Sequence, residues 1–159
     1  MSEHSSPTSF YFLATIDDEE KPAAFQEVTG ITAQIETAEI NEGGENRFVH
    51  RVPGRVKYEN LVLKRGMLQI RSAFYQWCYQ SLNGNLSQRK APKDLRVDLV
   101  DGQSENNQVL RGWVFAGGYP IKWEVGQRSA DGEQVIESLE FAYTHFHQIS
   151  TPIQPILDS

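Results

Sequence analysis

The sequence predicts a mainly β protein, built as an antiparallel sandwich or a partly closed β-barrel with one packed α-helix. Short segments that are rich in aromatic and β-branched residues, or that alternate apolar with polar side chains, recur along the chain. Glycine, proline, asparagine and aspartate lie between these segments, as turns require. A single segment has its apolar residues at the three- and four-residue spacing of a helix face.

The chain has 159 residues and a mass of 18.1 kDa, which is enough for one domain with its own core. We expect this β domain to cover residues 9–149. Residues 1–8 are polar and predict a flexible N-terminal tail. Residues 150–159 carry Pro152 and Pro155 among apolar side chains, which favours an extended C-terminal tail that could dock on a partner.

Charge and composition exclude several functions. The net charge is −6 and no basic run is longer than two residues, so we expect no specific nucleic-acid binding. The start of the chain lacks the apolar run of a signal peptide, and no stretch approaches the roughly 18 apolar residues of a membrane span. We therefore expect synthesis in the cytoplasm and no membrane partner. The single cysteine, Cys78, excludes an intramolecular disulfide and a cysteine-rich zinc site.

The first part of the chain predicts three strands. Ser9–Ile16 is dense in aromatic and β-branched residues, and the acidic turn that follows ends it. Ala24–Val28 is a short strand. After Gly30, apolar and polar residues alternate over Ile31–Ile40, which predicts a half-buried strand with one wet face. The polar residues of that face are Thr32, Gln34 and Glu36.

The second half predicts the helix and the remaining strands. Over Gln69–Leu82, the residues Phe74, Trp77 and Cys78 fall on one helical face, and Asn83-Gly84 predicts the end of the helix. The other predicted strands are Leu95–Val100, Val109–Phe115, Tyr119–Val125 and Gln134–Gln148, with Gly117-Gly118 as a separator and Pro120 at a bulge or strand edge.

The central stretch, residues 42–66, reads EGGENRFVHRVPGRVKYENLVLKRG. Gly43-Gly44 and Pro53-Gly54 predict that its first half is a long loop between strands and not part of a sheet. Tyr58–Lys64 then alternates as a strand does. A loop of this length in a compact domain usually has a function. The loop contains no nucleophile with its base, no phosphate cradle and no metal cage.

This stretch resembles the contractile phage tail-tube protein family, as found in phage-like contractile injection systems. The resemblance rests on Gly-Gly-Glu-Asn, on Pro-Gly-Arg, and on Leu61–Gly66 followed by a helix that carries a tryptophan, and it extends over residues 9–149. It implies a ring-forming fold and a structural subunit of the inner tube, which assembles as stacked hexameric rings around a central channel. Close relatives in such particles also act as tube initiators that join the tube to the spike, so both roles stay open.

The resemblance also implies partners and a location. The chain would contact itself, the sheath protein, and baseplate or spike proteins. DNA or protein cargo could pass through the channel. The protein would be a component of a phage tail or phage-tail-like particle, and any export would occur by release of that particle. Whether the particle is a phage or an injection system stays open.

Assembly into a ring of subunits predicts two sets of functional residues, one facing the channel and one at contacts between subunits. Unpaired strand edges are unstable unless they are covered, and a closed ring covers them. We therefore expect Ile31–Ile40 and Tyr58–Lys64, with two later strands, to form a sheet that continues from subunit to subunit around the channel. The polar positions predicted to face the lumen are Thr32, Gln34, Glu36, Asn60 and Lys64.

The second set lies in the central loop. Its three arginines would form an unpaired positive loop on an acidic protein, and guanidinium groups pair well with carboxylates of a neighbouring subunit. The carboxylates at residues 17–20 and 39–45 are candidates. The predicted inter-subunit contact residues are Arg47, Phe48, Arg51 and Arg55.

The sequence predicts no enzyme, and no metal or other cofactor. Cys78 could pair with His50 or His145 as a nucleophile with its base, but its place on an apolar helix face is typical of a buried, inert thiol. His145 and His147 could chelate a metal, but no third ligand is evident. The alternative function is a β-sandwich binding module for carbohydrate or peptide, which would use Trp77, Trp113 and Trp123 on one sheet face.

Overall fold

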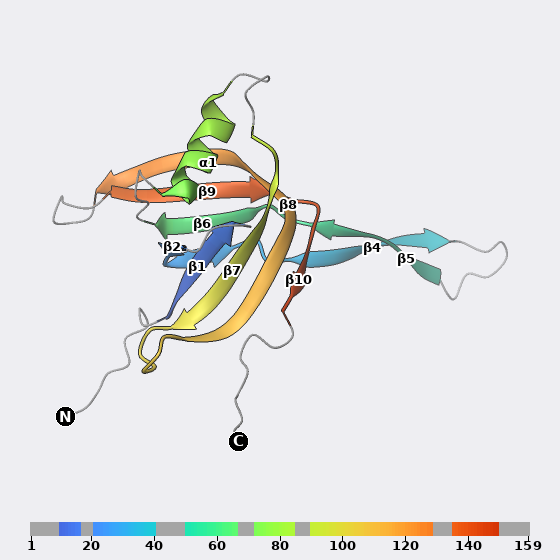
Figure 1. The fold of residues 1–159 in the computed structure, drawn as a ribbon. Coiled ribbons are helices and arrows are strands. Elements are labelled where there is room, and N and C mark those ends of the chain that lie inside the picture. Colours follow the sequence, from blue (N-terminus) through green and yellow to red (C-terminus); the bar gives the residue numbers. More distant parts are fainter. Residues whose placement is uncertain are drawn as a thin grey trace.

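The computed structural model describes residues 10–16, 21–40, 50–66, 72–84, 90–128 and 135–149, which form ten strands and one helix. The longest sheet has the strand order β2-β1-β7-β8-β9-β6-β3, and a further strand, β10, pairs with β8. All of its strand pairs are antiparallel (Figure 1). The strand bounds are β1 Phe10–Ile16, β2 Ala23–Phe25, β3 Glu27–Thr29, β6 Leu61–Gly66, β7 Lys93–Asp101, β8 Gln108–Arg128, β9 Val135–Ala142 and β10 His145–Gln148.

The sheet closes on itself because its two end strands, β2 and β3, are consecutive in the chain. Gln26 alone separates them, and its backbone N–H donates to the carbonyl oxygen of Lys64 on β6 at 3.2 Å. The chain therefore turns from one end of the strand order to the other within a single residue. The result is the partly closed β-barrel that the sequence predicts.

The core lies inside this barrel, and alternation along the strands explains its composition. Buried residues alternate with more exposed ones along much of β1, β2, β6 and β9 and the first half of β7, as expected of pleated strands that have one face on a core. The buried hydrophobic side chains from the strands include Ala14, Phe25, Leu61, Leu63, Leu95, Val97, Phe115, Leu139 and Phe141.

The helix α1, Ala73–Asn83, covers one side of this core with Phe74, Trp77 and Cys78, the apolar face that its spacing predicts. It begins at Ala73, and the predicted start, Gln69, lies outside the described residues. Ser72 is the N-cap, and its side-chain oxygen accepts from the backbone N–H of Tyr75 at 3.1 Å. The helix ends where Asn83-Gly84 predicts, and the Gly84 N–H donates to the Gln80 carbonyl.

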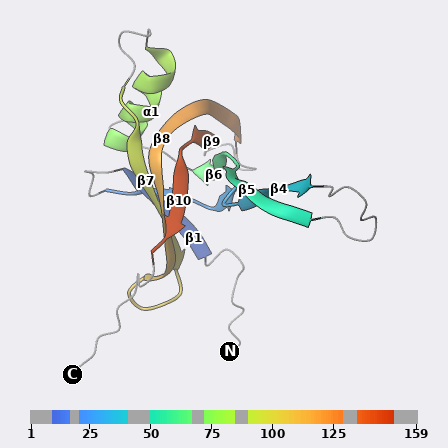
Figure 2. The same cartoon turned by 90° about the vertical axis from the view of Figure 1, so that its right-hand side faces the viewer.

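The other two strands form an antiparallel ribbon that is not part of the barrel. β4, Ala33–Ile40, pairs with β5, His50–Tyr58, in a separate two-stranded sheet. We call this ribbon the arm. It extends to one side of the barrel, and the same projection is visible in the perpendicular view (Figures 1 and 2).

The arm corrects two sequence predictions. The central loop was predicted to stay outside any sheet, yet residues 50–58 are a strand that contains Pro53-Gly54. Proline is tolerated there because β5 is an edge strand, and the register shifts between Ile35 and Thr37 of its partner, as a bulge requires. The predicted strand Tyr58–Lys64 was also wrong at its start, since Tyr58 ends β5 and β6 begins at Leu61.

Three further boundaries differ from the prediction. Gly117-Gly118 does not separate two strands, because β8 runs unbroken from residue 108 to residue 128. The predicted last strand is two strands: β9 pairs with the second half of β8, and β10 pairs with the first half. The predicted strand Ala24–Val28 is also two, β2 and β3. The bulge at Pro120 is confirmed by the register shift between Pro120 and Lys122.

Candidate assembly surfaces

The arm exposes apolar side chains, whose contact with water is unfavourable unless another surface covers them. Ile35 is 54% exposed and Val56, directly opposite on β5, is 46% exposed. Every residue of β4 is exposed, so the prediction of a half-buried strand over Ile31–Ile40 was wrong: the strand leaves the barrel and has no core to cover one face. Two strands without a core of their own are marginally stable in water, so a ribbon of this kind requires a partner surface.

The register of the arm sorts its residues onto two faces, because residues directly opposite each other share a face. One face, which we call the contact face, carries Ile35 with Val56, Thr37 with Pro53, and Glu39 with Arg51. Glu39 and Arg51 form an ion pair of 3.7 Å. The opposite face carries Gln34 with Lys57 and, on the same side of β4, Glu36. The contact face is therefore apolar near the barrel, and the other face is polar there.

Gly30 lies where the arm leaves the barrel. It joins β3 to the start of β4, and its φ of +93° is one that glycine adopts readily. A Cβ at this position would lie 1.9 Å from the carbonyl oxygen of Asn60, which lies just before β6. The backbone segments that enter and leave the arm are therefore in close contact at its base.

An aromatic cluster fixes the other strand of the arm at its base. The ring of Tyr58 lies 5.4 Å from that of Phe146 and 5.9 Å from that of Tyr143. The Tyr143 hydroxyl donates to the carbonyl oxygen of Glu59 at 2.6 Å. Burial, and then the neighbouring Tyr58 and Glu59, raises the pKa of Tyr143 to about 12. The cluster joins the end of β5 to Tyr143, which follows β9, and to Phe146 on β10.

We expect Tyr143→Phe to lose about 1 kcal/mol of unfolding free energy at neutral pH, because the hydrogen bond to Glu59 is lost. Between about pH 10 and pH 12 the unfolded chain releases the phenol proton while the folded chain keeps it, so wild-type stability falls as pH rises. The variant should decline less steeply in this window. Urea denaturation across pH 7–12 measures both effects. The matched control is Tyr119→Phe, an exposed tyrosine, and identical curves for wild type and Tyr143→Phe would contradict the prediction.

A polar surface covers the outside of the sheet formed by β3, β6, β9 and β8. Lys64 pairs with Glu27 across β6 and β3 at 3.7 Å, and Lys122 pairs with Glu124 along β8 at 3.9 Å. Asn60 donates to Glu140 on β9 at 2.9 Å. A hollow lined in part by Asn60, Glu140 and Lys57 connects this surface with the side of the arm that carries Gln34 and Lys57. We call the whole surface the polar face.

The structure brings some of the predicted lumen residues together. Asn60 and Lys64 lie on the polar face, and both bond to carboxylates there. Gln34 and Glu36 lie on the polar side of the arm, and Thr32 is half-exposed just before β4. The expected sheet is wrong in one respect: β6 pairs with β3 and β9, whereas β4 pairs with β5 and not with the barrel. That these five residues face a lumen stays a prediction.

The predicted contact residues are only partly described. Arg47 and Phe48 lie outside the described residues, as does the acidic run at residues 17–20. Arg51 and Arg55 are exposed on β5. Arg51 is already paired with Glu39 on its own arm, so the carboxylate that the prediction sought on a neighbour also exists within the chain.

Sequence reasoning missed a second surface, which lies beside the outer edge of β8. The pairing of β7 with β8 ends at Gly118, so the stretch from Tyr119 to Arg128 has a paired strand on one edge only among the described residues. Tyr119 is 45% exposed and Ile121 is 41% exposed. They border an open groove of about 450 Å³, which we name the helix groove, and its described lining residues are Ser81, Leu82, Lys90, Pro92, Tyr119, Pro120 and Ile121.

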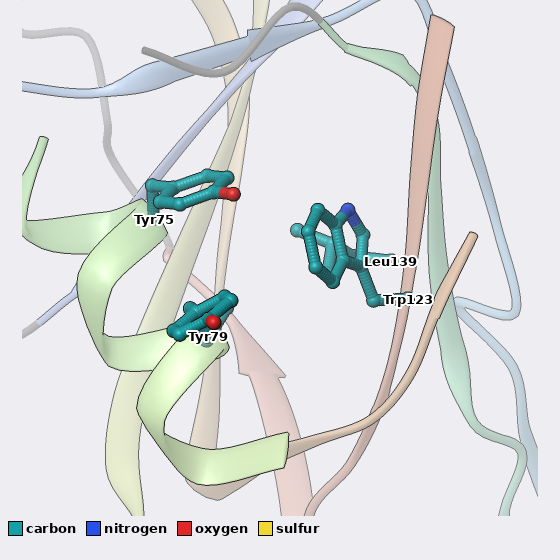
Figure 3. A pocket seen from close by; sticks show the side chains of 5 residues that line it. Tyr75, Tyr79, Trp123 and Leu139 are labelled. Carbon is teal, nitrogen blue, oxygen red and sulfur yellow. The ribbon is translucent and has the colours of Figure 1, made fainter. Parts of the chain in front are cut away.

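The tryptophans do not share a sheet face, as a carbohydrate platform would require. Trp77 is on α1 and buried, and its Nε1–H donates to the carbonyl oxygen of Ala91 at 3.2 Å. Trp123 points toward Tyr75 and Tyr79 of the helix (Figure 3). It donates to the Glu137 carboxylate at 2.7 Å, and the space between these rings and Leu139 leaves no room for a water molecule.

Of the residues considered for catalysis, the side chain of His50 is outside what the structure describes, and the others are not arranged for it. Burial, with a contribution from Glu137, raises the pKa of the Cys78 thiol, which is the opposite of what a nucleophile needs. His145 and His147 are exposed on β10. Within the described residues, no three His, Cys, Asp or Glu side chains are placed to hold a metal ion. The same residues contain no helix that is long and apolar enough to cross a membrane.

The barrel, its packed helix and the projecting arm define a structural protein of the tail-tube class. A family model described as "T4-like virus tail tube protein gp19" matches residues 8–147. The chain therefore belongs to this family.

Several solved structures have the same fold. A chain of the anti-feeding prophage baseplate, determined with six-fold symmetry, has a TM-score of 0.67 and 22% identity over 96% of this chain and 100% of that chain. A chain of an extracellular contractile injection system sheath-tube complex has a TM-score of 0.65 and 17% identity over 87% of both chains. A chain of the anti-feeding prophage tube-terminating cap has a TM-score of 0.66 and 19% identity over 94% and 93%. No curated protein sequence matches the chain.

Proposed function

We propose that the protein is a structural subunit of the inner tube of a contractile injection system or phage tail, and that it assembles as stacked hexameric rings around a central channel. The observation that carries the proposal is the arm, a ribbon without a core that exposes Ile35 and Val56. Such a ribbon is stabilised when another copy covers it. Family membership supports this assembly, and the similar chains come from a baseplate, a sheath-tube complex and a cap.

The polar face is the candidate lining of the channel. A water-filled bore requires hydrophilic side chains, and this face carries the cations Lys57, Lys64 and Lys122 with the anions Glu27, Glu124 and Glu140. The free edge of β8 lies at one side of the same sheet, where a strand of a neighbour could continue it. Sheath and baseplate or spike proteins are the expected outer partners, and DNA or protein is the expected cargo.

The arm also suggests where contacts between rings lie. β3 runs into β4, and β5 runs into β6, so the arm prolongs two strands of the sheet that carries the polar face. Strands of a closed barrel run at roughly 35–45° to its axis. If this sheet lines the channel, the arm projects out of the plane of its own ring and reaches the next one.

The proposal is tested by purifying the protein and examining it by sedimentation velocity and negative-stain electron microscopy. Rings, and stacks of rings, are the expected species. A monomer that binds a carbohydrate or peptide would instead support the binding-module alternative. The position in the intact particle separates the remaining roles: many copies along the shaft indicate the repeating tube, and six copies at the tip indicate the initiator.

Reversing the basic charges of the arm should prevent stacking. We expect Arg51→Glu with Arg55→Glu to stay folded by circular dichroism, because both side chains are exposed, and to form few or no stacked rings. Each exposed ion pair contributes less than about 1 kcal/mol, but repetition around a ring multiplies the effect. The control, Lys21→Glu with Arg111→Glu, makes the same change in net charge at exposed positions outside the arm. Normal stacks from the arm variant would contradict the assignment.

A further inference from the structure

Two histidines share the outer face of β10. His145 and His147 are separated by one residue, and successive side chains of a strand point to opposite faces. Phe146, between them, points toward the core, because it lies opposite the buried Phe115 and the two ring centroids are 5.3 Å apart. The two imidazoles therefore extend from the other side of β10, and both residues are exposed.

A chain of hydrogen bonds fixes the tautomer of His145. The hydroxyl of Thr144 lies 3.0 Å from the carbonyl oxygen of Ala116, which can only accept, so the hydroxyl donates its single hydrogen there. The Nδ1 of His145 lies 3.2 Å from the same hydroxyl oxygen, so Nδ1 carries the ring hydrogen and donates it. In the neutral imidazole, Nε2 is then the nitrogen with a free lone pair. Metal-binding histidines are oriented by such a hydrogen bond from their other ring nitrogen.

The side chains around the two histidines are small or already paired. Ala116 and Val114 lie directly opposite them on β8. Arg96 on β7 lies in the same row as Val114, but its guanidinium Nε bonds to the Asp98 carboxylate at 3.0 Å. Among the described residues, no strand pairs with the outer edge of β10 (Figure 2). The outer face of β10 is therefore open to an ion from solution.

The spacing of the pair suits a transition-metal ion. Their Cα atoms are about 7 Å apart along the strand, a distance that two imidazole rings and two metal–nitrogen bonds of about 2 Å can span. Zn²⁺ and Cu²⁺ bind imidazole nitrogen, whereas Mg²⁺ and Ca²⁺ prefer oxygen. The described residues supply no third His, Cys, Asp or Glu to the pair, and the thiol of Cys78 is buried. The remaining coordination positions are therefore open to water or to a side chain of another protein.

We propose that His145 and His147 bind one divalent ion of the Zn²⁺ and Cu²⁺ type on the outer face of β10. His145 binds through Nε2, and His147 through a ring nitrogen. Thr144 is the positioning residue that holds the first imidazole. The site includes no residue of the contact face, the polar face or the helix groove, so it does not depend on the proposed tube function.

Isothermal titration calorimetry with zinc chloride at neutral pH tests the site. We expect one saturable site per chain. Thr144→Val should weaken Zn²⁺ binding at least about tenfold, because loss of a group that orients a ligand costs about 10–100-fold in affinity. His145→Gln and His147→Gln should each weaken it at least as much, since each removes one of two protein ligands. Thr144→Ser keeps the hydroxyl and should bind as the wild type does.

The other two of the four histidines provide matched controls. His4→Gln and His50→Gln should bind Zn²⁺ as the wild type does, and circular dichroism reports folding of every variant. Electron paramagnetic resonance with Cu²⁺ should show two nitrogen ligands in the wild type and one in each β10 histidine variant. No saturable binding up to about 1 mM Zn²⁺, or wild-type affinity in both His145→Gln and His147→Gln, overturns the site. Unchanged binding in Thr144→Val overturns the positioning role.

Discussion

Trp77→Ala is expected to lower the free energy of unfolding by about 3–5 kcal/mol, which is a large part of the stability of a domain this size. The indole is 4% exposed and stacks on Phe141 with ring centroids 6.0 Å apart. It also meets Phe74 edge to face and donates to the Ala91 carbonyl. Truncation therefore leaves a cavity between helix and barrel and also leaves one carbonyl without its donor.

Urea denaturation, followed by circular dichroism, measures this loss. Trp77→Phe keeps an aromatic ring but not the hydrogen bond, so it should cost less than the alanine variant and at least about 1 kcal/mol. Gln80→Ala, at an exposed position of the same helix, should change stability by less than about 0.5 kcal/mol. If Trp77→Ala unfolds at the same urea concentration as Gln80→Ala, the helix does not pack as described.

The helix and the barrel core could be predicted from the sequence because their signals are local. The spacing of Phe74, Trp77 and Cys78 indicated one buried helix face, and Asn83-Gly84 indicated its end. Alternation likewise identified Leu95 and Val97 as interior residues of β7, but it placed Leu99 on the same face, whereas a register shift between Leu99 and Val100 buries Val100 instead. Burial against a core repeats with the period of the element, so a single sequence contains it.

The arm could not be predicted in the same way. Its residues are exposed on both faces, so no hydrophobic period marks β5, and Pro53-Gly54 indicates a turn when read alone. Pairing with β4 overrides that local preference. The division of β9 from β10 has a different cause: β8 changes partner at Gly117-Gly118, and the sequence prediction took this glycine pair as a break in β8 and not as a change of partner.

The candidate surfaces, too, could be predicted only where their signal is local in the sequence. Alternation predicted that Lys64 and Asn60 lie on a water-exposed side of the sheet, and both lie on the polar face. The helix groove escaped prediction because it combines residues of α1, the segment before β7, and β8, which are distant in sequence. Tyr119 and Ile121 are apolar residues in a strand, and the sequence alone gives no reason to expect them at an open edge.

Gly30→Ala is expected to lower the free energy of unfolding by at least about 3 kcal/mol and to abolish ring stacking. The φ of +93° strains any L side chain, and the new Cβ would overlap the Asn60 carbonyl oxygen, which belongs to backbone and cannot rotate away. Relief requires β4 and β5 to separate at the base of the arm. The arm then leaves the barrel in a different direction, whatever surface it binds.

Gly117→Ala is the matched control for this prediction. Gly117 also has a positive φ, +62°, but a Cβ there would meet nothing nearer than Thr144, at an ordinary contact distance of 3.5 Å. Its cost should be limited to the conformational preference, about 1–2 kcal/mol, and its rings should stack normally. The difference between the two variants in urea denaturation isolates the close approach of Gly30 to Asn60. Equal stability of the two variants, with stacking kept in both, would show that the base of the arm tolerates a side chain and that its direction is set elsewhere.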